Sequence, residues 1–158
     1  MKNSPSIKIC FGASSGGHSS QLFKLLEFQN DWSVKPSLFI STLEQYRATL
    51  EKRGSTYIIG ECNREHLIKL LAVLFRTFFI VAKERPDVII TTGALPMAAF
   101  CFWGKLFGAK IVWIDSIANV NSLSMSGAFV RHFADLFIVQ WPELASKYSG
   151  VEFVGALA

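Results

Sequence analysis

The sequence has few of the features that would place the chain outside the cell or across a membrane. Its three cysteines, Cys10, Cys62 and Cys101, match neither a disulfide framework nor a metal site in their spacing. It contains no uncharged apolar run of the roughly eighteen residues that a membrane-spanning helix needs. Residues 1–5 lack an apolar signal-peptide core, and no Asp-x-Asp pattern occurs. We therefore expect reduced thiols, no bound metal and a cytoplasmic location.

Strong charge is also absent. The formal net charge is +4, and no basic cluster is interleaved with stacking aromatic residues, so we expect no nucleic acid partner. An anionic membrane surface or a phosphorylated ligand fits this charge. Half of the residues are hydrophobic (51%) and the mean hydropathy is +0.33. This apolar excess requires a sheet buried on both faces, a partner subunit or a membrane surface.

The chain is one domain long, and residues 1–158 show no repeat, linker or low-complexity segment. Apolar runs predict strands at 7–11, 37–41, 56–60, 87–91, 110–114, 136–140 and 151–154. Helical spacing predicts helices at 17–29, 43–53, 65–84, 95–107, 127–133 and 142–148. Alternating strands and helices predict an α/β fold with a doubly wound parallel sheet, Rossmann-like, whose ligands bind beyond the carboxyl ends of the strands.

The most informative segment is the Gly/Ser-rich turn between the first strand and the first helix, residues 11–22. Small residues allow a ligand to approach the backbone, and a helix amino terminus favours anions. His18 adds a group that exchanges protons near neutral pH. The turn is neither a Walker sequence nor a Gly-x-Gly-x-x-Gly fingerprint. Phosphate binding with His18 as a base is one interpretation; a plain connection with a capping histidine is the other.

Two further segments end strands at the same predicted edge. Thr91, Thr92 and Gly93 follow a buried strand, where backbone N–H groups and hydroxyls can hold an oxyanion; an ordinary tight turn is the alternative. Residues 115–127 form a long polar loop that is costly to order without partners, so a ligand is plausible. Asp115 at its start can orient an acceptor hydroxyl, act as a base, or cap the next element.

The predicted helix at 65–84 is almost entirely apolar. Lys69, Arg76 and Lys83 recur every seven residues and form one narrow basic stripe. Such a stripe on an apolar helix suits the headgroup boundary of an anionic bilayer, with Phe75 and Phe79 as candidate membrane residues. The alternative is a buried helix whose charged side chains extend to water.

Four segments together resemble one protein family. They are residues 12–18 (Gly-Ala-Ser-Ser-Gly-Gly-His), 86–93 (Pro-Asp-Val-Ile-Ile-Thr-Thr-Gly), 115–127 (Asp-Ser to Leu-Ser-Met-Ser-Gly) and 137–143 (Phe-Ile-Val-Gln-Trp-Pro-Glu). In this order, over nearly the whole chain, they are similar to the Alg-fourteen-like family, whose bacterial members are called PssD-type proteins. That family is the acceptor-side, membrane-associating half of a split glycosyltransferase, equivalent to the N-terminal half of the GT-B fold of MurG-type enzymes.

The resemblance implies transfer of a sugar from a UDP-sugar to a lipid pyrophosphate-linked saccharide in capsule or exopolysaccharide biosynthesis. An Alg-thirteen-like or PssE-type subunit would bind the UDP-sugar, so we expect this chain alone to be inactive. The acceptor would be a polyprenyl-pyrophosphate-linked glycan at the cytoplasmic face of the cell membrane. No cofactor is implied.

By the same resemblance, His18 is the best candidate to deprotonate the acceptor hydroxyl, with Asp115 as the second catalytic candidate. Residues placed around the acceptor and its pyrophosphate are Gly12, Ser14, Ser15, Gly16, Gly17, Thr92, Gly93, Ser116, Asn119 and Asn121. Eukaryotic members carry Glu where Asp115 stands, which weakens a catalytic role there. They also carry an N-terminal membrane anchor; we expect this chain to attach instead through residues 65–84, other surface patches or partners.

Two other functions stay open at this stage. The chain can be a non-catalytic membrane recruiter that activates a catalytic partner, and in that case it does not need His18. It can also be a stand-alone nucleotide-binding domain using residues 12–18, in which case it binds a UDP-sugar by itself.

Overall fold

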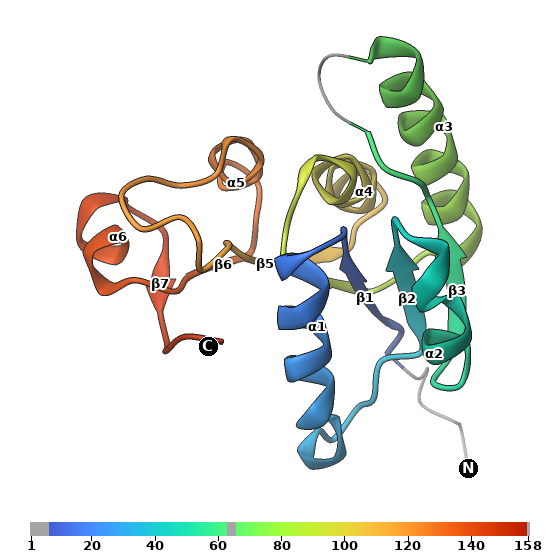
Figure 1. The fold of residues 1–158 in the computed structure, drawn as a ribbon, viewed down its shortest axis with the longest axis horizontal. Helices are drawn as coiled ribbons and strands as arrows, with labels where there is room; N and C mark the ends of the chain where they lie inside the picture. The colour runs from blue at the N-terminus through green and yellow to red at the C-terminus, as the bar shows by residue number, and fades with distance from the viewer. Residues whose placement is uncertain (1–6, 63–65, 158) are drawn as a thin grey trace.

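The computed structural model describes residues 7–62 and 66–157. Within them, seven parallel strands form one sheet in the order β3-β2-β1-β4-β5-β6-β7. The strands are β1 (Ile9–Ala13), β2 (Leu38–Ser41), β3 (Ser55–Ile58), β4 (Val88–Thr91), β5 (Lys110–Ile114), β6 (Leu136–Val139) and β7 (Glu152–Phe153). The chain starts in the middle, builds outward to β3, and returns to place β4 beside β1 (Figure 1). This order confirms the doubly wound, Rossmann-like sheet.

The helices cover the two faces of the sheet unequally. They are α1 (Gly17–Glu27), α2 (Arg47–Glu51), α3 (Leu67–Glu84), α4 (Leu95–Leu106), α5 (Met125–Val130) and α6 (Pro142–Lys147), with 3-10 turns η1 (Gln29–Asp31) and η2 (Glu44–Tyr46). Helices α1 and α2 pack on one face, whereas α3 to α6 pack on the other. In Figure 1, β1 points upward to the start of α1.

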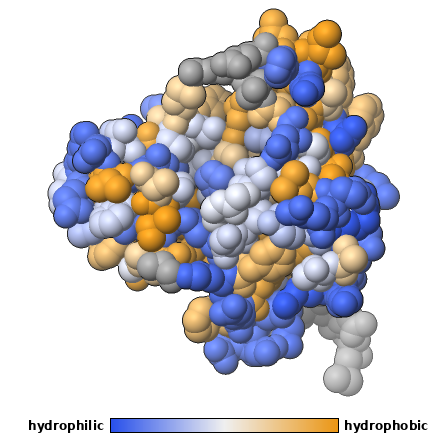
Figure 2. All heavy atoms as spheres, in the orientation of Figure 1, coloured by the Kyte–Doolittle hydropathy of each residue, from blue (hydrophilic) through white to orange (hydrophobic). Residues whose placement is uncertain are grey.

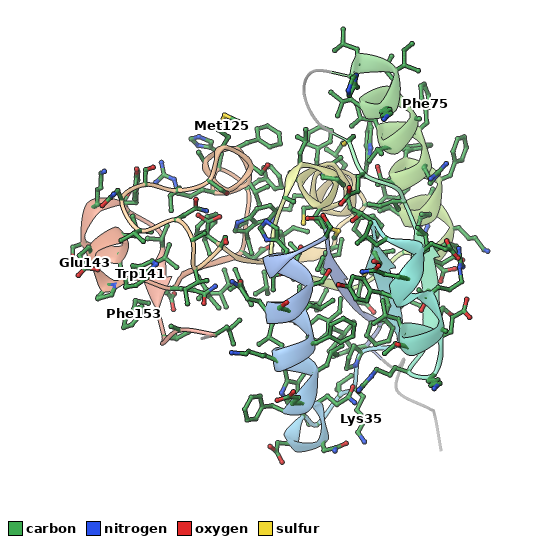
Figure 3. The ribbon with its side chains drawn as sticks, viewed as in Figure 1. Lys35, Phe75, Met125, Trp141, Glu143 and Phe153 are labelled. Carbon is green, nitrogen blue, oxygen red and sulfur yellow. The ribbon has the colours of Figure 1, made fainter. Side chains whose placement is uncertain are left out.

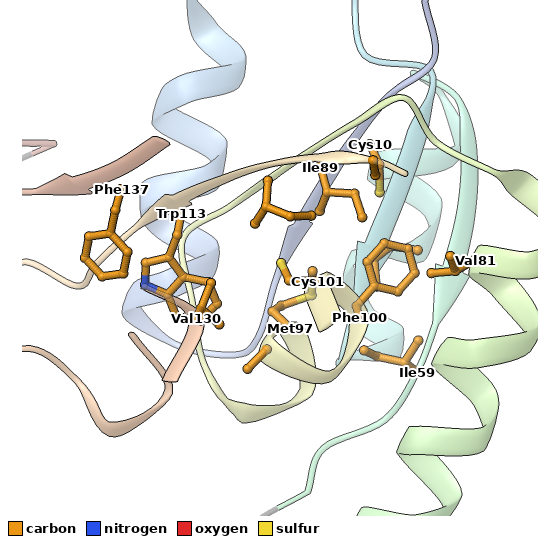
Figure 4. Packing of buried hydrophobic residues seen from close by; sticks show 14 of the residues in the cluster. Cys10, Ile59, Val81, Ile89, Met97, Phe100, Cys101, Trp113, Val130 and Phe137 are labelled. Atoms are coloured by element: carbon orange, nitrogen blue, oxygen red, sulfur yellow. The ribbon is translucent and has the colours of Figure 1, made fainter. Parts of the chain in front are cut away.

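Alternating strand residues point to the two cores. On β1, Cys10 packs in the larger core under α3 and α4, while Phe11 packs under α1. Figure 4 shows the larger core, in which Met97, Phe100 and Cys101 of α4 meet the sheet. The cysteines are free, as predicted, and burial raises the pKa of the Cys10 and Cys101 thiols. These buried thiols therefore act as core residues.

Several predicted boundaries were wrong. The first strand runs over Ile9–Ala13 rather than 7–11, because Gly12 pairs with β2 and β4 although glycine disfavours strands. A Cβ on Gly12 would lie 2.1 Å from Cε of Met97, so the glycine allows α4 to approach. The predicted helix 43–53 is a 3-10 turn followed by a short helix. Helix α5 starts at Met125, earlier than predicted, because the Ser124 hydroxyl accepts a hydrogen bond from the Gly127 N–H.

Helix α3 is buried along one narrow side only. Its buried residues are Val73, Thr77, Ile80 and Val81. The opposite side exposes large apolar residues: Leu67, Ile68, Leu71, Phe75 and Phe79. Figure 2 shows hydrophobic residues gathered at the upper end of the molecule, over α3. The fully buried alternative for this helix was therefore wrong; residue 65, predicted as its start, lies outside the described residues.

None of the helices among the described residues is long and apolar enough to cross a membrane. Thr77, on the buried side of α3, donates through its hydroxyl to the carbonyl of Val73 at 2.8 Å.

Asp135 connects α4 to the start of β5. Its carboxylate accepts hydrogen bonds from Lys105 Nζ (2.7 Å), Lys110 Nζ (3.0 Å) and the Ile111 N–H (2.9 Å). Partial burial opposes ionisation, but these three donors outweigh it and lower the pKa of Asp135 to about 2. The carboxylate therefore stabilises the fold in its ionised form.

We predict that Asp135→Asn lowers the free energy of unfolding by about 1 kcal/mol at pH 7, because charged hydrogen bonds near the surface have modest net strength. Because the folded pKa lies below the unfolded one, the wild-type stabilisation is complete above pH about 4 and is lost as the pH falls towards about 2. Urea unfolding of both proteins across this range measures the difference. The exposed Asp31→Asn serves as the control, and a difference independent of pH contradicts the prediction.

Candidate functional site

The site lies where β1 and β4 run side by side and the chain leaves them in opposite directions. Chain order reverses there, which is the position where open parallel sheets bind ligands. The Gly/Ser turn, residues 14–16, follows β1, and Thr92 and Gly93 follow β4. Thr92 N–H donates to the Gly12 carbonyl at 3.4 Å. Two of the three segments identified in the sequence are therefore adjacent in the structure.

His18, in the first turn of α1, is held by two reciprocal hydrogen bonds to Thr92. Its Nδ1 lies 2.6 Å from the Thr92 carbonyl oxygen, and the Thr92 hydroxyl donates to the His18 carbonyl at 2.7 Å. A carbonyl oxygen only accepts, so Nδ1 carries the proton and donates. In the neutral ring, Nε2 then holds the free lone pair. The half-buried imidazole is thus held with Nδ1 towards Thr92 and with the lone pair on Nε2.

Gly93 fits between His18 and a buried tryptophan. A Cβ on Gly93 would lie 3.2 Å from Cε1 of His18 and 3.3 Å from Cζ2 of Trp113, and the residue has φ +112°. Both the close contacts and the positive φ disfavour any side chain. The Gly93 N–H donates to the Thr91 hydroxyl at 3.1 Å, so that N–H is already used. Gly93 therefore permits the position of His18 by being small.

Asp115, at the end of β5, is buried and surrounded by donors. Only 1% of it is exposed. Its carboxylate accepts from the Ser124 hydroxyl (2.6 Å), the Ser124 N–H (2.9 Å), Trp113 Nε1 (3.2 Å) and, more weakly, Asn119 Nδ2 (3.5 Å). Ser124 in turn caps α5. Of the three roles left open by the sequence, this geometry favours support of the next element.

Residues 116–124 form a loop held mainly by its own contacts. The Ser116 hydroxyl accepts from the Ala118 N–H at 3.3 Å, and the exposed Asn121 accepts from Lys147 Nζ through its carbonyl at 2.8 Å. Trp141, labelled in Figure 3, donates through Nε1 to the Ile117 carbonyl at 2.7 Å. Much of the polarity of this loop is therefore satisfied within the protein.

Gln140, in the Val-Gln-Trp-Pro-Glu segment, connects three parts of the chain. Its Nε2 donates to the Asp115 carbonyl (2.8 Å) and to Gln21 Oε1 of α1 (2.9 Å), and its Oε1 accepts from the Leu157 N–H (2.7 Å). The glutamine is buried. The segment thus links α1, the loop after β5 and the C-terminal residues.

A polar cleft of about 360 Å³ opens beside the Gly/Ser turn. It is lined by Ser14, Ser15, Glu61, Cys62, His66, Lys69, Ala94, Leu95 and Pro96. Lys69 supplies a cation to the cleft, and α4 begins there, with its positive dipole end towards the cleft. Lys69 and the start of α4 favour a phosphate group, whereas the carboxylate of Glu61 in the same lining opposes one. Among the described residues, the lining includes neither Ser116, Asn119 nor Asn121.

Sequence reasoning missed most of this cleft wall. Glu61, Cys62 and His66 precede α3 and carry no motif, and Lys69 was assigned to a membrane stripe. The stripe itself is real, but Arg76 donates to the Ile59 carbonyl (2.9 Å) and Lys83 to the Tyr57 hydroxyl (3.0 Å). The basic stripe therefore follows the side of α3 next to β3.

No group of three His, Cys, Asp or Glu side chains in residues 7–62 and 66–157 is arranged to hold a metal ion. The prediction that the site uses no metal and no cofactor stays a prediction.

The architecture matches one Rossmann-like half of two-domain sugar-nucleotide enzymes. MurG of Acinetobacter baumannii superposes with a TM-score of 0.73 at 13% identity, over 93% of this chain and 45% of that one. UDP-GlcNAc 2-epimerase of Methanocaldococcus jannaschii superposes with a TM-score of 0.69 at 13% identity, over 95% and 47%. The chain thus spans less than half of these solved structures, and the likeness shows the fold.

The chain belongs to the family described as "Oligosaccharide biosynthesis protein Alg14 like", whose model matches residues 58–157. It is 44% identical over 172 residues to the "UDP-N-acetylglucosamine transferase subunit alg14" of Schizosaccharomyces pombe, covering 91% of this chain and 80% of that protein. The mouse subunit of the same name is 26% identical over 181 residues, covering 96% and 83%. The resemblance found in the sequence is confirmed.

We predict that Asp115→Asn lowers the free energy of unfolding by about 1–3 kcal/mol, because an amide nitrogen replaces one acceptor and faces the Ser124 donors. Thermal and urea unfolding measure this. The control is Ser122→Ala, an exposed change in the same loop, which should stay within about 0.5 kcal/mol. Unchanged stability of Asp115→Asn, together with lost activity, would instead indicate a chemical role for the carboxylate.

Proposed function

We propose that this chain is the acceptor-binding, membrane-peripheral subunit of a two-chain glycosyltransferase. The pair would transfer a sugar from a UDP-sugar to a lipid pyrophosphate-linked saccharide. One observation supports the proposal: His18 is oriented by Thr92 at the edge where open parallel sheets generally bind ligands, near a cleft that contains Lys69. Residues 1–158 would form the single acceptor-side half-domain.

In this mechanism, His18 is the general base. Nδ1 stays bonded to the Thr92 carbonyl, and Nε2 takes the proton of the acceptor hydroxyl. The acceptor oxygen then bonds to the anomeric carbon of the donor sugar, while the bond from that carbon to the diphosphate breaks and its electron pair leaves with UDP. A positioned base of this kind contributes about 10²–10⁴-fold in rate.

The acceptor pyrophosphate would lie over the Gly/Ser turn and the cleft. Ser14, Ser15 and Lys69 line the cleft. Gly16 and Gly17 lie at the amino end of α1, where the absence of side chains leaves the backbone accessible to an anion. Gly12, Thr92 and Gly93 would act through their backbone groups. The two glycines would also act through their small size, and Thr92 through its internal hydrogen bonds. We place Ser116, Asn119 and Asn121 farther out, towards the saccharide. Asp115 would position this loop rather than touch the reacting atoms.

The donor would be bound by a second subunit of the Alg-thirteen-like or PssE-type class. The solved two-domain proteins are more than twice as long as this chain, and the curated relatives are named as subunits. Those names specify UDP-N-acetylglucosamine transfer, which favours that donor. We therefore expect the chain to be inactive without its partner.

The exposed apolar side of α3 would attach the chain to the cytoplasmic face of the cell membrane. Phe75, on the outer side of α3 in Figure 3, is 64% exposed, and Lys69, Arg76 and Lys83 flank that side. Capsule or exopolysaccharide biosynthesis is the setting that the resemblance implies, and we include it in the proposal.

A recruiter without a catalytic group is the second candidate. The large apolar side of α3 and the word "subunit" in the names of the relatives favour it. It predicts that the pair works without His18, whereas a stand-alone nucleotide-binding domain predicts UDP-sugar binding by this chain alone.

We predict that sugar transfer requires both subunits and falls about 10²–10⁴-fold in the pair with His18→Ala, because the acceptor hydroxyl then has no base. The measurement is transfer from radiolabelled UDP-N-acetylglucosamine to lipid-linked acceptor in membranes.

His132→Ala serves as the matched control, since His132 is an exposed histidine after α5. It should leave transfer unchanged. Full activity of the His18→Ala pair would reduce the chain to a recruiter, and activity of this chain alone would refute the two-chain proposal.

We predict that Ile68→Asn lowers binding to vesicles containing anionic lipid by about tenfold or more, because Ile68 is 85% exposed and would lose its transfer into the bilayer. Vesicle co-sedimentation measures this. The control is Phe28→Ser, which removes an exposed aromatic residue at the end of α1. Equal losses in both variants would contradict a membrane-binding side on α3.

A further inference from the structure

Gln21, one turn after His18 on α1, is a buried side chain whose amide nitrogen has no partner. Only 4% of the residue is exposed. Its Oε1 accepts a hydrogen bond from Gln140 Nε2 at 2.9 Å, whereas its own Nε2 makes no hydrogen bond to any of the described residues. Polar side-chain atoms in buried residues are nearly always hydrogen-bonded. This nitrogen therefore indicates an acceptor that the chain itself does not supply.

Two backbone groups determine how both amides are oriented. The Leu157 N–H only donates, so it faces Gln140 Oε1 (2.7 Å), and the Asp115 carbonyl only accepts, so it faces Gln140 Nε2 (2.8 Å). The second N–H of that nitrogen then donates to Gln21, which must present its oxygen. A flipped Gln21 would bring two amide nitrogens together. Gln21 Nε2 is therefore held on the side away from Gln140, with both of its N–H groups unused.

Gln21 lies beside His18 on α1, because residues three apart on a helix have Cβ atoms roughly 5–6 Å apart. His18 contacts Thr92 at the end of β4, whereas Gln21 is linked through Gln140 to the Asp115 carbonyl at the end of β5. The polar cleft, in contrast, is lined by the Gly/Ser turn, by α4 and by the segment leading into α3, and these two helices pack on the sheet face opposite α1. The cleft and Gln21 therefore approach His18 from different sides.

Ser116 adds a second unused donor near Gln21. It follows Asp115, whose carbonyl and Gln21 Oε1 are bonded to the same nitrogen of Gln140. The half-buried Ser116 hydroxyl accepts from the Ala118 N–H at 3.3 Å, and within the described part of the chain its own proton has no acceptor. Two neutral donors thus lie at the same edge of the sheet as the lone pair of His18 Nε2.

Neutral donors of this kind match the hydroxyl and carbonyl oxygens of a saccharide. Because Gln21 Nε2 has two N–H groups, it can donate to two neighbouring oxygens of one sugar ring. A phosphate group is bound instead by cations and by the free N–H groups of a helix amino terminus. The helical hydrogen bonds of α1 already begin before Gln21, since the Ser20 N–H donates to the Gly16 carbonyl at 3.2 Å. The position of Gln21 therefore favours an uncharged ligand oxygen.

We propose that Gln21 is a specificity-determining residue whose Nε2 donates hydrogen bonds to oxygens of the acceptor saccharide. This rests on the proposed function and adds that the chain recognises the sugar itself, on the β5 side of His18. Gln140 is then a positioning residue, because it binds Gln21 Oε1 and leaves Nε2 for the ligand. The Ser116 hydroxyl supplies a second contact to the same saccharide.

The test uses the full chain and two readouts, the nitrogen-15 resonances of its glutamine side chains and calorimetry. The probes are farnesyl diphospho-N-acetylglucosamine and farnesyl diphosphoglucose, compared with methyl farnesyl diphosphate, which has the same charge and no sugar. At least one sugar-bearing probe should shift the Gln21 Nε2 resonance, assigned by its loss in Gln21→Met, whereas the methyl diester should not. The same probe should bind about fivefold or more tightly than the methyl diester. Gln21→Met should abolish this difference and keep the affinity for the methyl diester.

Gln29→Met is the matched control, because Gln29 is a half-buried glutamine in η1, beyond the last residue of α1. It should leave all three affinities unchanged. A Gln21 resonance that neither sugar-bearing probe shifts would overturn the proposal, as would an equal shift with the methyl diester. Equal weakening of all three probes in Gln21→Met would also overturn it, since the side chain then only supports α1.

These binding measurements are separate from sugar transfer. A sugar preference that depends on Gln21, in a chain that supports no transfer with its partner, would refute the proposed function and keep the saccharide contact. Transfer by the pair without any such preference would overturn the saccharide contact alone.

Discussion

The pairing of β1 with β4 is the constraint on which the site depends. It brings His18 and Thr92, which are 74 residues apart in the chain, close enough to exchange hydrogen bonds across the reversal of chain order. Because each residue donates a side-chain bond to the other's carbonyl, the start of α1 and the end of β4 are held together at two points. The imidazole is oriented by the backbone, and the orientation needs no charged partner.

The other buried polar residues of the site support the contact between His18 and Thr92. Trp113 packs where a Gly93 side chain would lie and donates to Asp115, and Asp115 holds the loop that begins α5. Gln140 joins the same loop to α1. Removing one buried member leaves the donors or acceptors of the next unsatisfied, which is costly inside a protein. We therefore interpret the polar residues after β5 as the support for His18.

The sequence predicted the sheet, because β1, β4 and β5 are apolar runs that end at small or polar residues. It also predicted that His18, Thr92 and Gly93 lie at one edge of the sheet, because the carboxyl ends of parallel strands lie together. These inferences use local patterns and one topological rule.

Other parts of the site depend on contacts that no local pattern encodes. An aspartate after a strand can cap, orient or catalyse, and only the burial of Asp115 with four donors separates these roles. The cleft wall at Glu61, His66 and Lys69 arises from the packing of the α3 start against the Gly/Ser turn. Helical spacing gave the basic stripe, but only the packing of α3 on α4 showed which apolar side stays exposed.

Helix α3 contributes to two surfaces that the proposed function uses, the polar cleft and the exposed apolar side. In the proposed function, the polar cleft would hold the pyrophosphate of the acceptor, whereas the apolar side of α3 faces away from the core. A lipid-linked acceptor held this way would present its reacting end at the Gly/Ser turn without leaving the membrane surface completely. In the proposed function, the fold would thereby couple membrane attachment to the position of the base.

In the proposed function, the chain presents the lone pair of His18 Nε2 to the acceptor. Nitrogen-15 chemical shifts of the histidine rings at neutral pH test it most directly, with His18 assigned by its loss in His18→Gln. We expect the neutral form of the ring to carry its proton on Nδ1 and to leave Nε2 unprotonated. A ring protonated at Nε2 and free at Nδ1 would contradict it, because the lone pair would then face the Thr92 carbonyl.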